Sequence, residues 1–165
     1  MRRFAIAGVA LIAALALAPG ASAAKKLRGG FSTLSAGTAA GLSLKGKAQI
    51  KRTASATTVK IHVRGLPPGT TFAAHLHNAP CSSPNPGGGH YKHDPAGPGV
   101  PPNELWLSST RDPTAGITAN RGGVAHGRGS APWVARPEAS SVVIHQIPAG
   151  GTTAGGPKIA CADLH

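Results

Sequence analysis

TTVKIHVRGLPPGTTFAAHLHN (residues 57–78) decides the fold class, because it holds two runs of alternating apolar and polar side chains around a turn. In the first run, Val59, Ile61 and Val63 share one side of an extended chain, and basic and imidazole side chains share the other. The proline and glycine residues of LPPGT then favour a turn. The stretch therefore predicts two half-buried β-strands joined by a short connection.

The second run brings two imidazoles to one face of its strand. One face carries Phe72, Ala74 and Leu76, and the other carries Ala73, His75 and His77. Because side chains two positions apart in a strand point the same way, His75 and His77 are expected to lie side by side. Paired imidazoles are candidate ligands for copper, zinc, iron or nickel.

The remaining chain is divided into short runs of the same kind, separated by glycine and proline. Further strand-like runs occupy residues 42–52, 103–109, 116–120, 122–129, 140–147 and 158–164. A long irregular segment over residues 78–102 contains His90 and His93. This spacing is typical of an all-β sandwich or barrel, which we assign to one domain over residues 42–165. Residues 24–41 show no periodicity and are predicted to be a flexible lead-in.

The amino-terminal residues have the pattern of a secretory signal peptide. Arg2 and Arg3 precede an almost unbroken apolar run over residues 4–18, and small residues follow at 21–23. We predict a signal peptide over residues 1–23, with a retained membrane anchor as the alternative, because the run is short and rich in alanine. The mature protein is then secreted or held in the periplasm or cell envelope, with no anchor left after cleavage.

Cys81 and Cys161 are the only cysteines in the chain. In an oxidising compartment two cysteines of a short exported protein usually pair, so the sequence predicts one disulfide. Two free thiols are the alternative.

The composition narrows the possible functions. Lys and Arg number 17 and Asp and Glu 5, a formal charge of +12 that falls to +10 once Arg2 and Arg3 are removed. This charge on a chain with 23 Gly and 15 Pro is compatible with disorder or polyanion binding. Aromatic residues are only 4% and the basic residues are dispersed, which argues against nucleic-acid binding. The chain has no G-x-S-x-G, H-E-x-x-H or CxxC motif, and its acidic residues are too few and scattered to indicate a paired-carboxylate hydrolase.

From Leu42 to Leu164 the order of these pieces resembles the copper/zinc superoxide dismutase family. GLPPGTTFAAHLHNAPC is similar to the family's strand, turn and H-x-H segment before its first disulfide cysteine. SSVVIH is similar to its V-V-H strand, and GGPKIACAD to its ending with the second cysteine. The resemblance implies an eight-stranded Greek-key β-barrel or sandwich whose long loops cover the metal site, with Cys81 and Cys161 on the family disulfide.

The resemblance also implies a set of copper ligands. His75, His77 and His145 fall on copper positions, and His90 falls on the histidine that bridges copper and zinc in the family. Lys158 stands in place of the family's substrate-guiding arginine and would draw superoxide anion toward the metal. Lysine keeps the positive charge but lacks the planar fork of arginine.

The zinc positions of the family are poorly matched. His93 matches at most one of the two further zinc histidines, and Glu104 or Asp94 would have to replace the zinc aspartate. Ala149 stands where the family has an aspartate that orients both metal sites. We therefore favour a copper-only site, with copper plus zinc as the alternative.

The resemblance favours a superoxide dismutase, in which His90 would release copper and relay a proton. An exported copper-binding or copper-sequestering protein with little turnover is the first alternative. A basic cell-envelope binding module without metal is the second. His62, His126 and His165 are interpreted as surface residues outside the metal site.

Overall fold

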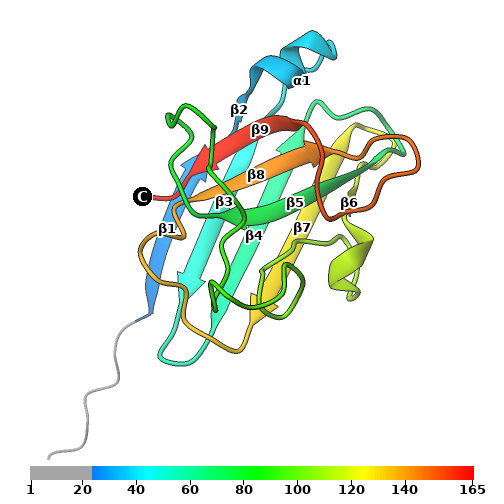
Figure 1. Ribbon diagram of the computed structural model, residues 1–165. Helices are drawn as coiled ribbons and strands as arrows, with labels where there is room; N and C mark the ends of the chain where they lie inside the picture. Colours follow the sequence, from blue (N-terminus) through cyan, green and yellow to red (C-terminus); the bar gives the residue numbers. More distant parts are fainter. Residues whose placement is uncertain (1–23) are drawn as a thin grey trace, which may run out of the picture.

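The computed structural model describes residues 24–165 and contains two antiparallel β-sheets packed face to face (Figure 1). The predicted signal peptide, residues 1–23, lies outside the described residues. Within the described range the two sheets do not join into one closed barrel, so the all-β sandwich is confirmed. Over the same range, no helix has the length and apolar character needed to cross a membrane.

The two sheets have different sizes and strand orders. The four-stranded sheet has the order β1-β3-β4-β7 and contains β1 (Lys25–Gly30), β3 (Lys45–Arg52), β4 (Thr57–Arg64) and β7 (Val124–Ala131). The five-stranded sheet has the order β2-β9-β8-β5-β6 and contains β2 (Ser32–Thr33), β9 (Lys158–Asp163), β8 (Ser141–Gln146), β5 (Thr71–His77) and β6 (Ile117–Thr118).

The hydrophobic core lies between the sheets and follows the predicted alternation. Val59, Ile61 and Val63 of β4 are buried, whereas the intervening Lys60 and His62 are exposed. From the other sheet, the core receives Phe72, Ala74, Leu76, Val142, Ile144 and Ile159. Burial of these side chains on one face of each sheet fixes the register, because a slip of one residue would turn every apolar side chain outward.

Residues 24–41 are not the flexible lead-in that the sequence predicts. β1 pairs with β3 along its whole length, β2 pairs with β9, and the short helix α1 (Ser35–Ala39) follows. Phe31, between β1 and β2, is 6% exposed and belongs to the core. β1 is the edge strand of its sheet and has no fully buried residue, so its sequence lacks apolar alternation. Backbone pairing, which leaves no periodic signal, holds it in place.

Residues 103–109 form isolated bridges instead of the predicted strand. Glu104 pairs with Lys92 and Ser108 with Arg128 of β7. A side chain at Gly129 would lie 2.4 Å from the backbone oxygen of Trp106, so glycine lets this segment cross close over β7. The segment then turns through a short 3-10 helix, η1 (Pro113–Ala115), into β6.

Cys81 and Cys161 form the predicted disulfide, with a Cα–Cα distance of 5.8 Å. The bridge joins the loop after β5 to β9, across a sequence separation of 80 residues. It thereby fastens one of the loops that cover the outer face of the five-stranded sheet.

Replacing both cysteines by serine should lower the free energy of unfolding by about 4 kcal/mol, because the unfolded chain regains the entropy of a long closed loop. For a domain of this size the melting temperature should fall by about 10 °C. Thermal and denaturant unfolding of the oxidised protein, the reduced protein and the double variant would test this. The reduced protein should match the variant, and a variant that melts with the oxidised protein would contradict the expectation.

Candidate metal centre

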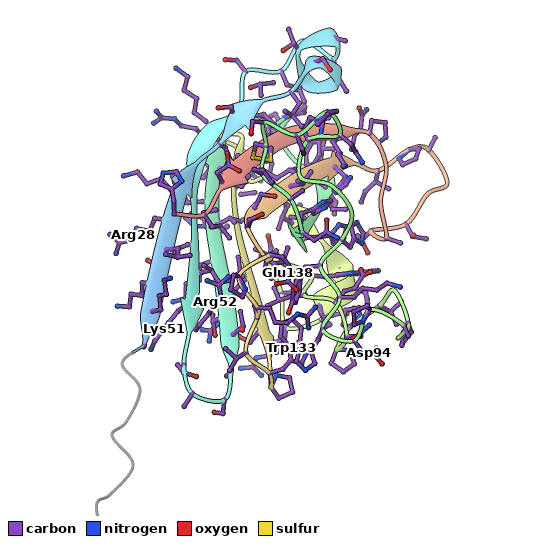
Figure 2. The ribbon with its side chains drawn as sticks, turned by 60° about the vertical axis from the view of Figure 1, so that its left-hand side comes forward. Arg28, Lys51, Arg52, Asp94, Trp133 and Glu138 are labelled. Carbon is purple, nitrogen blue, oxygen red and sulfur yellow. A yellow bond between two sulfur atoms is a disulfide. The ribbon has the colours of Figure 1, made fainter. Side chains whose placement is uncertain are left out.

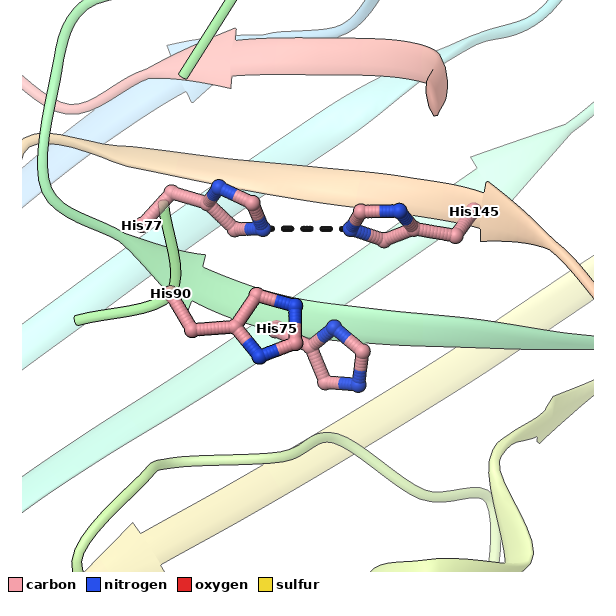
Figure 3. A group of neighbouring side chains, drawn as sticks. All are labelled: His75, His77, His90 and His145. Atoms are coloured by element: carbon pink, nitrogen blue, oxygen red, sulfur yellow. Dashed lines mark hydrogen bonds between the residues drawn. The ribbon is translucent and has the colours of Figure 1, made fainter. Parts of the chain in front are cut away.

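The imidazoles of His75, His77, His90 and His145 meet on the outer face of the five-stranded sheet (Figure 3). His145 lies opposite Ala73 in the β5–β8 pairing, so the strand register places it on the face that carries His75 and His77. His90 comes from the loop after β5 and bridges to His77 through the backbone. One nitrogen from each ring lies within 4.8 Å of the others. All four residues predicted as copper ligands are therefore brought together.

Three of these imidazoles are almost completely buried and one is partly open. The exposed fractions are 1% for His75, 0% for His77 and 3% for His145. The side chain of His90 is 20% exposed. β5 is buried on both faces, because the core covers one side and the indole of Trp106, 5.0 Å from the His75 ring, helps to cover the other. His90 is thus the imidazole through which solvent reaches the cluster.

Hydrogen bonds determine which nitrogen keeps a lone pair in the rings of His75 and His145. His75 Nε2 donates to the carbonyl oxygen of Thr153 at 2.7 Å, and His145 Nδ1 donates to that of Gly156 at 2.9 Å. A carbonyl oxygen accepts only, so each of these nitrogens carries the proton. The opposite nitrogens, His75 Nδ1 and His145 Nε2, are then free to bind a metal ion.

The contacts around His77 also favour a metal ligand. His77 Nε2 lies 3.1 Å from His145 Nε2, and Figure 3 shows the two rings pointing at each other. Both His75 Nδ1 and His77 Nδ1 are buried without a hydrogen-bond partner. Buried polar atoms are rarely left unpaired. A cation between the rings would satisfy His75 Nδ1 and replace the close contact between two nitrogens, so the residues present fit a histidine-ligated metal.

Glu104 fixes the orientation of His90. Its Oε2 atom accepts from His90 Nδ1 at 2.7 Å and from Trp106 Nε1 at 2.7 Å. Burial alone would raise the pKa of the Glu104 carboxyl, but the hydrogen bonds from His90 and Trp106 lower it below its ordinary value. The carboxylate therefore stays charged, and His90 Nε2 is left as the free ligand nitrogen.

The three buried imidazoles are held neutral. Burial lowers the pKa of His75 and of His77 to about 2, with a smaller lowering from the charges of the neighbouring histidines. Burial likewise lowers the pKa of His145 to about 4, although its bond to the Gly156 carbonyl raises it slightly. Neutral imidazole is the form that binds metals, so these ligands need no deprotonation at neutral pH.

Of the residues considered for zinc, Glu104 contacts the cluster, whereas His93 and Asp94 make other contacts. The ring of His93 stacks on Trp133, with 4.9 Å between centroids and 3° between planes. Asp94 caps a turn by accepting from the backbone of Ala96, and Ala149 is exposed. Glu104, offered as a replacement for the zinc aspartate, bonds instead to His90 Nδ1, the nitrogen a bridging histidine would give to a second ion.

The sequence did not indicate Trp106, or the carbonyl oxygens of Thr153 and Gly156, as parts of the site. The two carbonyl oxygens fix the orientation of the His75 and His145 rings. Every residue has a backbone carbonyl group, so the sequence does not show which of them accepts a hydrogen bond from a site residue. The glycine-rich loop over residues 149–157 is the only sequence feature that could have indicated these carbonyls, because the backbone carbonyl groups of a loop of that length need hydrogen-bond donors.

Lys158, the predicted substrate-guiding residue, lies beside the cluster and is tied to a loop. Its Nζ donates to Asn85 Oδ1 at 2.6 Å and to the carbonyl oxygens of Pro86 and Gly88 at 2.9 and 2.5 Å. All three ammonium hydrogens are used in this way. Its charge nevertheless contributes a little to the lowered pKa values of His77 and His145.

No protein-family model matches the sequence, and no curated protein matches it. The chain is therefore characterised by its structure, as an all-β sandwich with one disulfide and a buried four-histidine cluster that can hold a metal ion.

Proposed function

We propose that the four-histidine cluster holds one copper ion and that the protein is a copper-only superoxide dismutase, a member of the copper/zinc superoxide dismutase family. The observation that carries the proposal is the nitrogen arrangement of the cluster. His75 offers Nδ1, His145 and His90 offer Nε2, and His77 Nε2 faces His145 Nε2. The paired cysteines favour an exported protein, because disulfides persist in oxidising compartments.

The bond between His90 and Glu104 supports copper without zinc. A histidine can bridge two metal ions only if neither of its ring nitrogens carries a proton. Here Nδ1 donates to a charged carboxylate at 2.7 Å. The negative charge of Glu104 takes the place that a second cation would have beside the imidazole.

Copper bound in this cluster would supply one-electron chemistry, in which one superoxide is oxidised to dioxygen and a second is reduced and takes up two protons to give hydrogen peroxide. His75, His77 and His145 project from paired strands and provide a rigid, dry ligand set. His90 projects from a loop and is the solvent-accessible member. Its Nε2 can alternate between metal ligand and proton carrier, while Glu104 keeps the Nδ1 proton and the ring in place.

Lys158 supports the proposal through its charge. Its hydrogens are committed to the loop, so it cannot bind an anion in the two-pronged manner of arginine. Its positive charge beside His77 and His145 still attracts superoxide. An attractive field of this kind weakens as salt screens it.

The copper-loaded protein should accelerate superoxide decay above the rate with metal-free protein, and Lys158→Gln should reduce the rate about tenfold at low ionic strength. The rate of the variant should also depend less on salt, since the attracting charge is gone. Pulse radiolysis at several ionic strengths measures both effects. Lys158→Arg keeps the charge and should retain most of the rate. Decay no faster than the metal-free background would overturn the proposal.

A copper-binding protein with little turnover is the second candidate. It is favoured because all three ammonium hydrogens of Lys158 are donated to the loop and none is left to bind superoxide. It predicts stoichiometric copper with no catalytic decay of superoxide. Metal analysis together with the decay assay therefore separates the two functions.

A further inference from the structure

The outer face of the four-stranded sheet is covered by exposed cations. Figure 2 shows Arg28 and Lys51 projecting from this sheet, on the side away from the covering loops. Eight of the chain's 17 Lys and Arg side chains lie on this face, all exposed: Lys26, Arg28, Lys45, Lys47, Lys51, Lys60, Arg64 and Arg128. We call this surface the basic face.

The strand register sets like charges opposite one another on the basic face. Lys60 lies opposite Arg128, and Lys26 opposite Lys51. Like charges directly opposite in an antiparallel sheet are destabilising. The five acidic residues, Asp94, Glu104, Asp112, Glu138 and Asp163, lie on none of these four strands. In the described part of the chain, no ion pair involves any of the eight cations. The face therefore carries an uncompensated charge that an anionic partner would neutralise.

Two grooves on this face meet at its centre. One, of about 650 Å³, is lined by Arg28, Lys60, Arg128, Ser108 and Ser109. The other, of about 810 Å³, is lined by Lys45 and Arg64. Both grooves are lined by Lys47 and His62, so they adjoin at these residues, and we call the two grooves together the track.

The cations lie in rows along this track. Arg28, Lys60 and Arg128 form the first row, Lys47 with the His62–His126 pair forms the second, and Lys45 with Arg64 forms the third. The two imidazoles of the middle row have their centroids 4.7 Å apart. Alternate residues of a strand are about 7 Å apart, so a linear polyanion along the track meets a cationic row at each such interval.

We propose that the basic face binds a linear phosphate polymer that carries no bases. The four strands contain no Phe, Tyr or Trp, and Phe31, which lines the second groove, is only 6% exposed, so no such ring is open for a nucleobase to stack on. The exposed large apolar residues among those described, Val100 and Val134, lie on other segments, so nothing on the face inserts into a bilayer. The lysine and arginine side chains of the two grooves can donate to phosphate oxygens along a chain. This site is independent of the proposed copper chemistry.

Fluorescence anisotropy with labelled inorganic polyphosphate tests the proposal. Lys60→Gln with Arg128→Gln should weaken binding at least tenfold at low salt. It should also reduce the slope of log Kd against log salt by about 1.4, since two phosphate contacts are lost at about 0.7 each. Arg111→Gln with Arg121→Gln removes the same net charge from exposed loop residues that line neither groove, and it should change Kd less than twofold.

Further measurements keep the proposal falsifiable. Monophosphate at the same phosphate concentration should not compete, and the Lys60 and Arg128 double variant should melt no lower than the parent and keep its copper-binding capacity. Equal weakening by the two double variants would show that only net charge matters and would overturn the proposal. Tighter binding to oligothymidine or to phosphatidylglycerol vesicles than to polyphosphate would overturn it in favour of nucleic acid or membrane.

Discussion

Replacing His77 and His145 together by alanine is expected to abolish stoichiometric copper binding. The two nitrogens that face each other at 3.1 Å are removed, and only two imidazoles of the cluster remain. Loss of a group that merely orients a metal ligand typically costs 10–100-fold in affinity, so loss of two ligands should weaken binding by more than 100-fold. Copper content after dialysis, and competition with a chelator of known affinity, measure the change.

The outer-face pair His62 and His126 supplies a matched control. Their double alanine variant also removes two neighbouring imidazoles, at 4.7 Å between ring centroids, but on the other sheet. It should keep full copper content. Because the alanines at His77 and His145 leave buried space, glutamine at both positions provides a second variant that fills it. Copper retained at one ion per chain in both cluster variants would contradict the assigned ligands.

Acidification should strongly destabilise the metal-free protein. The pKa of His145 is about 4 in the folded state, and those of His75 and His77 are about 2. In the unfolded chain histidine has a pKa near 6.5. Between pH 6.5 and 4 the unfolded chain therefore binds protons at three positions that the folded protein leaves neutral. The free energy of unfolding falls with pH by up to about 1.4 kcal/mol per unit for each histidine, and by up to about 4 kcal/mol per unit in total.

Urea unfolding of the metal-free protein at pH 7, 6 and 5 measures this dependence. Above pH 6.5 these three histidines should leave the free energy of unfolding nearly constant. Below pH 6.5 the free energy of unfolding should begin to fall. His77→Leu removes one of the three groups and should reduce the slope by about one third. A free energy of unfolding that stays level from pH 7 to pH 5 would show that the cluster is not held neutral.

The central strands could be predicted because burial on one face leaves a periodic pattern. Val59, Ile61 and Val63 of β4 alternate with exposed residues, as the sequence indicates. The same parity placed His75 and His77 on one face of β5. The disulfide was predicted from cysteine number and compartment, which requires no geometry.

The peripheral elements could not be predicted, because their positions depend on backbone pairing across long sequence distances. β1 and β2 are fixed by hydrogen bonds to β3 and β9 and carry no apolar alternation. Residues 103–109 have the composition of a strand, yet they pair only through isolated bridges. Local propensity does not distinguish a ladder from a series of bridges.

Within the site, the ligands were predictable and their supports were not. The four histidines came from a resemblance in motif order, and the structure brings them together. The sequence offered Glu104 as a replacement zinc ligand, but its partner His90 is 14 residues away and the bond depends on the loop path. Lys158 was predicted from its position before Cys161, whereas its bonds to Asn85, Pro86 and Gly88 depend on a loop 70–73 residues distant.

The position of β9 determines when the five-stranded sheet can be assembled during folding. This last strand lies between β2 and β8, and the terminal His165 exchanges backbone hydrogen bonds with Arg28 of β1. β9 follows every other strand of the described chain, so β2 has no partner until β9 has been made. A chain truncated before residue 158 lacks one cysteine of the bridge and leaves the exposed edges of β2 and β8 unpaired. Open edges of this kind recruit other chains. Pairing of β9 thus closes both edges and brings Cys161 to Cys81 in one step.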